Sequence, residues 1–540
     1  MEDHTSLRAE LRQMVESLWE RYTTETMPMV EEMRKLLTQC DVAAAAAATL
    51  TSTHSSYITP AGRRWFALKS REKKKKSDDR VAKCFRHISK VVGERLAESN
   101  FYTAIHEVYG DRVNLGTGAF FIGGSDTEPL NFTYIPFGTF VIDEDSRERV
   151  HTLVRKFKYT PAQAEMEWGK ENLPDKIKAW CENPRMRYTQ QVEFAQIVRP
   201  NRSMVMSGWK DIPLHQRAYE GFYVETEGYE IIKREGFYEF PFLVTRYLKE
   251  AGTPYGTPPG KKVLPAIRQV VKLERLMDTL AETQAFPRIL QLARQNKQVD
   301  MRAGGITTIS EEAARLNMPR EWGTQGRYDI GLDRIRDKEE AIRRAYHEDM
   351  LLSVSAQSKQ MTAREVDERS AEKILAFTPS FTLFINDNQT AMLRILGVLL
   401  RRGEIDAKDV PEELLSRKED GTVGLVSPHI AYLGRIAQAL ELIIARGTQA
   451  VVDNVVNWVQ QTGRPQMLDW IDEEALVRSW VDSLGCSDDI VISEADIAAK
   501  KEEQKAAGEM QQQAAMDADT LEAVGKFAQI QSSMRKGGAR

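Results

Sequence analysis

Several short runs contain residue types that bind phosphate, and each lacks part of the pattern that this chemistry requires. The run 260–262 reads Gly-Lys-Lys, without the upstream glycine and the Ser or Thr of a nucleotide-binding loop. Gly116 and Gly118 begin like a dinucleotide fingerprint, but Phe121 stands where the third glycine is needed. We therefore interpret these glycines as turn residues.

The residues that could hold a metal or attack a substrate are equally incomplete. His106-Glu107 is followed by Val-Tyr-Gly, so the two-histidine zinc motif is missing, and no G-x-S-x-G run occurs. The run 143–145, Asp-Glu-Asp, could hold a divalent ion, but an exposed acidic turn is the favoured interpretation. No C-x-x-C pair occurs among the cysteines, Cys40, Cys84, Cys181 and Cys486. The sequence predicts no catalytic residue, no metal and no cofactor.

Basic residues are the remaining candidates, as ligands for a polyanion. The formal net charge is −4, so no overall positive field attracts nucleic acid. The run Lys73–Lys76 could contact DNA or another acidic partner, although a solvated loop is the favoured interpretation. Any contact with nucleic acid must therefore come from local patches.

The elements that position these residues are expected to be mixed helix and strand, with helix dominant. The 540 residues are enough for two or more domains. Residues 1–50 have apolar side chains at helical spacing, residues 51–62 are rich in Ser, Thr, Pro and Gly and predict a loop, and a helical pattern returns up to about residue 109. No run approaches the ~20 apolar residues of a membrane-spanning helix.

Two stretches have residue patterns that predict β-strands. In residues 114–142, Gly116, Gly118, Gly123 and Gly124 separate β-prone segments, which predicts hairpins with strands near Ala119–Ile122 and Phe132–Ile135. Residues 191–247 form the second stretch. Its strand candidates are Phe222–Val224, Tyr229–Ile232 and Phe240–Thr245.

Long helices dominate the rest of the chain. After a Pro- and Gly-rich crossing at 252–260, a helix is predicted over 263–284, and a second, densely charged helix with a thin apolar face over 332–352. A third is predicted from Thr362 to Arg402, where Gly403 ends it. Residues 404–500 are expected to be helical, most clearly at Ile430–Ile444 and Ala450–Val459.

Five segments match, in order and spacing, the motifs of one protein family. They are Trp65–Leu68, Phe132–Asp145, Val154–Gln163, Tyr255–Pro265 and Met361–Arg369. The last begins Met-Thr-Ala-Arg-Glu-Val, with Arg364 where the family has threonine. Over about residues 50 to 500 the chain resembles the portal, or head-to-tail connector, proteins of short-tailed bacteriophages.

The resemblance implies an α+β, mainly helical portal fold with named regions. These would be a wing at 1–260 and 361–402, stem helices at 261–287 and 332–352, a clip at 288–331, a channel loop at 353–360, a crown at 403–500, and a tail at 501–540 that is helical or disordered. It further implies a closed ring of identical subunits, expected to be a dodecamer, at one capsid vertex.

Partners and setting also follow from the resemblance. Expected partners are the terminase large subunit, a tail adaptor, the major capsid and scaffolding proteins, and the double-stranded DNA that is packaged and ejected through the ring. The protein would be a virion component assembled in the cytoplasm of the host bacterium, without a membrane partner, and not an enzyme. A passive structural adaptor or scaffolding protein fits the composition equally well.

Candidate DNA-facing residues lie on the channel loop and the first stem helix. Lys359 is the only charged residue of the loop and is expected to form a ring of positive charge near the axis, unless it forms a salt bridge between subunits. The polar loop residues would line the same passage: Ser353, Ser355, Gln357 and Ser358. Arg268, Lys272 and Arg275 are weaker candidates, because helix–helix pairing with the acidic residues of 333–349 is the favoured use.

Overall fold

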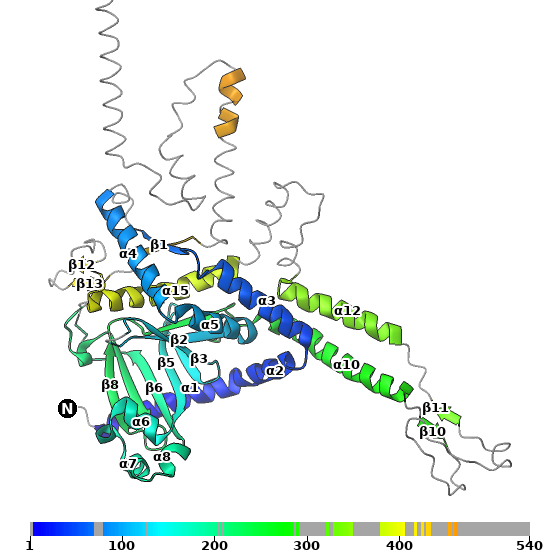
Figure 1. Ribbon diagram of the computed structural model, residues 1–540, viewed down its shortest axis with the longest axis horizontal. Helices are drawn as coiled ribbons and strands as arrows, with labels where there is room; N and C mark the ends of the chain where they lie inside the picture. The colour runs from blue at the N-terminus through cyan, green and yellow to red at the C-terminus, as the bar shows by residue number, and fades with distance from the viewer. Residues whose placement is uncertain are drawn as a thin grey trace, which may run out of the picture. The chain divides into compact units, whose positions relative to one another are not determined.

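The computed structural model describes residues 4–69, 79–125, 128–203, 205–206, 210–285, 288–290, 320–322, 328–348, 378–405, 415–417, 423–425, 428–433, 452–455 and 457–461 (Figure 1). Contacts divide the chain into two compact units, one made of Met1–Arg71 and Cys84–Leu440, the other of Glu72–Lys83 and Glu441–Arg540. In the second unit the described residues are all helical. Those at 452–455 and 457–461 agree with the helix predicted over Ala450–Val459.

Three helices occupy the N-terminal segment, which confirms the helical prediction for residues 1–50. They are α1 (His4–Glu25), α2 (Met27–Leu37) and α3 (Asp41–Tyr57). The loop predicted from residue 51 is wrong as far as Tyr57, because α3 continues to that residue, and Ser and Thr hydroxyls there donate to carbonyls one turn earlier, as Thr51 does to Ala47 at 2.9 Å. His54 continues the buried face of α3, so packing outweighs the low helix propensity of these residues.

The strands form two main antiparallel sheets. One has the order β3-β2-β9 and the other the order β4-β5-β6-β7-β8. The bounds are β2 Thr117–Gly123, β3 Asn131–Ile135, β4 Phe140–Glu144, β5 Val150–Tyr159, β6 Val192–Pro200, β7 Tyr219–Glu225, β8 Ile231–Phe237 and β9 Phe242–Arg246. Ala119 pairs with Ile135, which confirms the hairpin predicted in residues 114–142.

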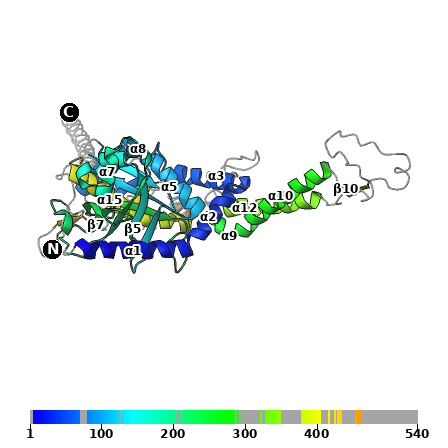
Figure 2. The same ribbon diagram turned by 90° about the horizontal axis from the view of Figure 1, so that it is seen from below.

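Helices cover both faces of the five-stranded sheet. Along β6, Ala195 belongs to a core shared with Leu11 and Val15 of α1, which lies against these strands (Figure 2). Phe194, one residue earlier, packs instead with Trp168 of α6 (Pro161–Trp168) in a separate cluster. Two short helices complete this side: α7 (Asp175–Glu182) and α8 (Met186–Thr189). The alternation follows from the two-residue period of a strand.

The three-stranded sheet is packed by two helices that lie far apart in the sequence. The helix α5 (Phe101–Leu115), which follows α4 (Asp79–Glu98), packs on β2 and β3. The helix α15 (Thr378–Arg402) packs on β9 and β2. Gly403, with φ of +76°, ends α15 as the sequence predicts.

A short strand pair joins two segments from opposite halves of the sequence. The strand β1 (Phe66–Lys69) pairs antiparallel with β14 (His429–Tyr432). The helix predicted from Ile430 is therefore wrong at its start, because Ile430 and Tyr432 alternate into the core as strand residues do. A further strand pair, β12 (Leu415–Arg417) with β13 (Val423–Leu425), also departs from the helical prediction for 404–500.

The two long helices follow a short turn of helix at α9 (Pro259–Lys262). They are α10 (Leu264–Ala285) and α12 (Tyr328–Ala345), which lie side by side in Figures 1 and 2. Beyond the end of α10, β10 (Arg288–Leu290) pairs with β11 (Arg320–Trp322). The second helix, predicted over 332–352, is α12, which starts at Tyr328 and ends at Ala345. It ends earlier than predicted because His347, at φ of +59°, has left the helical conformation.

Candidate functional site

The DNA-facing residues predicted from the sequence divide into two groups in the structure. Lys359 and the polar residues Ser353, Ser355, Gln357 and Ser358 lie outside the described residues, as does the run Lys73–Lys76. Arg268, Lys272 and Arg275 all lie on α10 and are exposed. The candidate site is therefore built on α10 and the helices around it.

The first half of α10 is held by an apolar cluster. Ile267, Val270 and Val271 are buried against Leu36 of α2, a row of alanines of α3 and Ile342 of α12. Beyond Val271 no described side chain of α10 is fully buried. The outer half of α10 therefore has only a thin apolar face, which it shares with α12.

The two long helices approach each other closely in the half of α10 that lies beyond its buried residues. A Cβ atom placed on Gly331 of α12 would lie 2.5 Å from the Met277 sulfur of α10. At the inner level, Ile342 and Tyr346 of α12 are fully buried in the cluster that contains Val270. The contact between Gly331 and Met277 fixes which residues of α10 and α12 lie at the same height along the pair.

A groove of about 700 Å³ lies between α10 and α2. Its lining residues are Pro28, Glu31, Glu32, Lys35, Leu36, Gln39, Arg268, Val271, Lys272, Arg275, Leu276 and Thr279. Leu276 is 54% exposed in this groove. The groove thus combines an apolar floor with a rim that has more cationic than anionic side chains.

One ion pair crosses this groove. The Nε and Nη2 atoms of Arg268 each donate to a Glu32 carboxylate oxygen at 2.6 Å, a two-bond geometry that matches guanidinium to carboxylate. Hydrogen bonding from Arg268 lowers the pKa of the Glu32 carboxyl below its usual value. The expected pairing of Arg268 with acidic residues of 333–349 is therefore wrong, because Glu32 of α2 lies nearer.

Lys272 and Arg275 differ from Arg268, because neither has a counter-ion among the residues that the structure describes. Within the described part of the chain, neither side chain forms an ion pair with a carboxylate, on α12 or elsewhere. They face the groove on the α2 side of α10, whereas α12 packs on another face. These two cations are thus available for a partner outside the chain.

A second constellation, which the sequence analysis missed, is a buried set of charges that fixes α15. Arg246 at the end of β9 bonds Asp387 of α15 at 3.0 Å and also pairs with Glu144. The side chains of Arg246 and Asp387 are only 5% and 9% exposed. Lys249 bonds the same Glu144 at 2.9 Å. The run 143–145 is therefore not an exposed acidic turn, since Glu144 neutralises these two cations.

Two further buried contacts hold the ends of α15. Arg112 of α5 is fully buried and donates to the Ser380 carbonyl at 2.5 Å and to the Ser380 hydroxyl at 2.9 Å. Arg401 donates two bonds to Glu239, at 2.7 and 2.6 Å. A sequence-level signal for such pairs is weak, because the partners are far apart in the chain. The helix α15 is thus fixed to α5 near its start and to the loop between β8 and β9 near its end.

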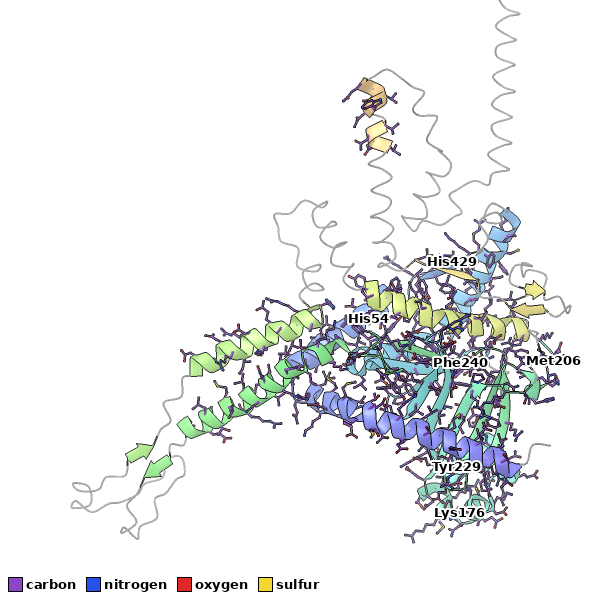
Figure 3. All side chains as sticks on the ribbon, turned by 180° about the vertical axis from the view of Figure 1, so that it is seen from behind. His54, Lys176, Met206, Tyr229, Phe240 and His429 are labelled. Carbon is purple, nitrogen blue, oxygen red and sulfur yellow. The ribbon has the colours of Figure 1, made fainter. Side chains whose placement is uncertain are left out.

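His54 of α3 is a buried histidine (Figure 3). Its ring lies 5.7 Å from Tyr109 and 6.0 Å from Tyr247, centroid to centroid. Burial, with the charges of Arg112 and His347, lowers the pKa of His54 well below 6.5. His54 is thus held neutral and serves packing.

The remaining motif candidates have structural explanations. Gly116 has φ of +95° and ends α5, which confirms the interpretation as a turn for that residue, whereas Gly118 lies in β2 and is not in a turn. Gly260 packs closely, since a Cβ atom there would lie 2.5 Å from the Met33 methyl. Among the residues that the structure describes, no group of three His, Cys, Asp or Glu side chains could hold a metal ion. In the same residues, no helix has the length and apolar character needed to span a membrane.

Exposed, charged faces on a pair of long helices are typical of proteins that assemble with other chains. Residues 4–491 match the family described as "Bacteriophage head to tail connecting protein". The chain belongs to this family, as the motifs at 65–68, 132–145 and 255–265 predict.

Individual relatives agree with the family. A probable portal protein of Bordetella phage BPP-1 is 21% identical over 486 residues, 88% of this chain and 83% of that protein. The portal protein of Salmonella phage epsilon15 is 22% identical over 492 residues, 90% of this chain and 85% of that protein. A solved neck of an empty GTA particle shares 9% identity over 69% of this chain and 82% of its own, with a TM-score of 0.34.

Proposed function

We propose that this chain is a portal subunit, and that identical copies close into a ring at one vertex of the capsid. The double-stranded DNA would enter and leave through the ring, which would bind the terminase large subunit during packaging and the tail adaptor afterwards. The major capsid and scaffolding proteins would surround it. Membership of the head-to-tail connecting family supports this proposal.

The observation that carries the proposal is the pair α10 and α12. A helix pair that buries its apolar residues only at the foot and along one thin stripe needs further partners to be stable. In a closed ring, copies of the same pair supply those partners. We therefore propose that α10 and α12 are the stem, the residues between them the clip, 353–360 the channel loop, and 403–500 the crown.

The chemical role that we propose is guidance of DNA without catalysis. DNA presents one negative charge for every ~1.7 Å of axis, so tight phosphate contacts would resist its movement. Positive charge near the axis would come from Lys359. Lys272 and Arg275 are secondary candidates, and Arg268 is a poor one because Glu32 already neutralises it. Energy for translocation would come from the terminase.

Electron microscopy of the purified full chain in negative stain tests the proposal. A portal gives rings with a central hole, and a dodecamer is the expected copy number. Elongated or irregular particles would instead show a scaffolding or adaptor protein. Intrinsic ATPase activity in the purified protein would also contradict the proposal.

A further inference from the structure

Two rows of exposed charge with opposite sign lie on the two long helices. On α10, Arg268, Lys272 and Arg275 follow one another at i, i+4 and i+7, the spacing that places side chains on one helix face. On α12, Asp333, Asp337 and Glu340 repeat this spacing. We call these the basic row and the acidic row.

Contacts inside the chain neutralise only one end of each row. Arg268 pairs with Glu32, and Glu340 pairs with Arg344 one turn further along α12. Lys272, Arg275, Asp333 and Asp337 have no ion pair within the described residues. Two cations on α10 and two carboxylates on α12 thus have no ion-pair partner among the described residues.

The fold prevents the two rows of one chain from meeting. The basic row lines the groove on the α2 side of α10, whereas α12 contacts α10 through Val270 and Met277 on a different face. The acidic row is exposed on the side of α12 that does not carry its buried residues Ile335 and Ile342. Among the described residues, neither row therefore has a partner within its own chain.

The basic row and the acidic row lie at similar positions along the length of the helix pair. The Gly331–Met277 contact sets a common level for the two antiparallel helices, from which Arg275 lies about 3 Å and Lys272 about 7.5 Å further inward along α10, at 1.5 Å per residue. On α12, Asp333 lies about 3 Å and Asp337 about 9 Å inward from the same level. Rotation about a ring axis keeps each residue at its height when the helix pair runs along that axis. A neighbouring copy therefore brings its acidic row to the height of this basic row.

We infer that the groove between α2 and α10 receives the α12 helix of the neighbouring copy, with Lys272 and Arg275 paired to Asp333 and Asp337 of that copy. The inference rests on the proposed function, because it needs a ring of identical chains. Leu276, 54% exposed in the groove, and Leu332, 36% exposed beside the acidic row, would add apolar contact. Arg334 and Arg336 flank the acidic row and lie outside the contact.

Such an interface is heterologous, because each copy offers its basic row to one neighbour and its acidic row to the other. Charge reversal on one row alone would place like charges opposite each other at every interface of the ring. Like-charge contact across an interface suppresses association. When chains with a reversed basic row alternate with chains that have a reversed acidic row, every contact in the ring again joins opposite charges.

The test uses two full-length variants and their mixture. One variant carries Lys272→Glu and Arg275→Glu, and the other carries Asp333→Lys and Asp337→Lys. Each alone should need at least about tenfold more protein than the wild type to form rings in sedimentation velocity. An equimolar mixture should form rings again, with the two chains alternating, which native mass spectrometry detects as equal numbers of each.

A matched control carries Lys170→Glu and Lys176→Glu, the same change of net charge on exposed side chains away from α10. It should assemble as the wild type does. Variants that assemble normally when alone, or a mixture that is not rescued, would overturn the inference while wild-type rings keep the proposed function intact. A basic row that served DNA instead would give variants that assemble normally when alone. Absence of rings in the wild type would refute the proposed function itself.

Discussion

At the scale of single residues, the structure depends on buried charges whose partners are distant in the sequence. Arg246, Asp387 and Glu144 come from β9, α15 and β4, and each is mostly buried. A buried charge without its partner is strongly destabilising. The positions of these residues are thus set by one another, and no local pattern of apolar spacing announces them.

The buried His54 makes stability depend on pH. Its folded pKa is lowered well below 6.5 because burial, Arg112 and His347 all oppose a positive charge. Below about pH 6.5 the unfolded chain takes up a proton on His54 that the folded chain excludes. The free energy of unfolding therefore decreases as the pH is lowered, by about 1.4 kcal/mol per pH unit, until the folded pKa is reached.

We therefore expect the wild-type melting temperature to drop between pH 7 and 5.5 in circular dichroism, and His54→Phe to flatten the drop. His347, whose pKa burial also lowers, would account for a remaining slope. The exposed His106→Gln variant is the control and should keep the wild-type profile. An unchanged slope in His54→Phe would show that other groups control the acid response.

At the scale of elements, a close backbone approach joins α5 to the three-stranded sheet. A Cβ atom on Gly118 of β2 would lie 2.3 Å from the Val108 carbonyl oxygen of α5. Gly118→Ala should therefore push α5 off the sheet and cost about 1–3 kcal/mol in chemical denaturation. Gly110 of the same helix has nothing within 4 Å of such an atom, so Gly110→Ala should stabilise by about 0.5–1 kcal/mol. Equal effects of both changes would contradict the packing argument.

Elements defined by local periodicity could be predicted, and those defined by distant partners could not. The helix predicted over 263–284 is α10, within a residue at each end, because its apolar repeat is regular. Ile430–Tyr432 fall at the start of the helix predicted over Ile430–Ile444 but belong to β14, since β1 offers them an edge to pair with. Likewise, Arg268 lies on the predicted helix, but its partner on α2 could be identified only from the fold.

At the scale of the whole molecule, a single residue is repeated around the proposed ring. If Lys359 faces the axis, Lys359→Glu replaces a ring of positive charge with a negative one that repels DNA. We expect ring assembly to be unchanged and the yield of DNA-filled heads to fall by about tenfold, measured by packaging of genomic DNA into purified shells. Lys359→Arg keeps the charge and should package normally. Normal filling by the glutamate variant would show that this side chain does not approach the DNA.

The pairing of β1 with β14 has a consequence for synthesis on the ribosome. The strand β1 is made early, but its partner emerges only after most of the chain has been translated, on the order of tens of seconds later at bacterial elongation rates. Until then one apolar edge, Phe66–Leu68, remains open to any other nascent strand. Rapid translation or a bound chaperone would shorten or shield this interval, and chains released before residue 429 should aggregate through that edge.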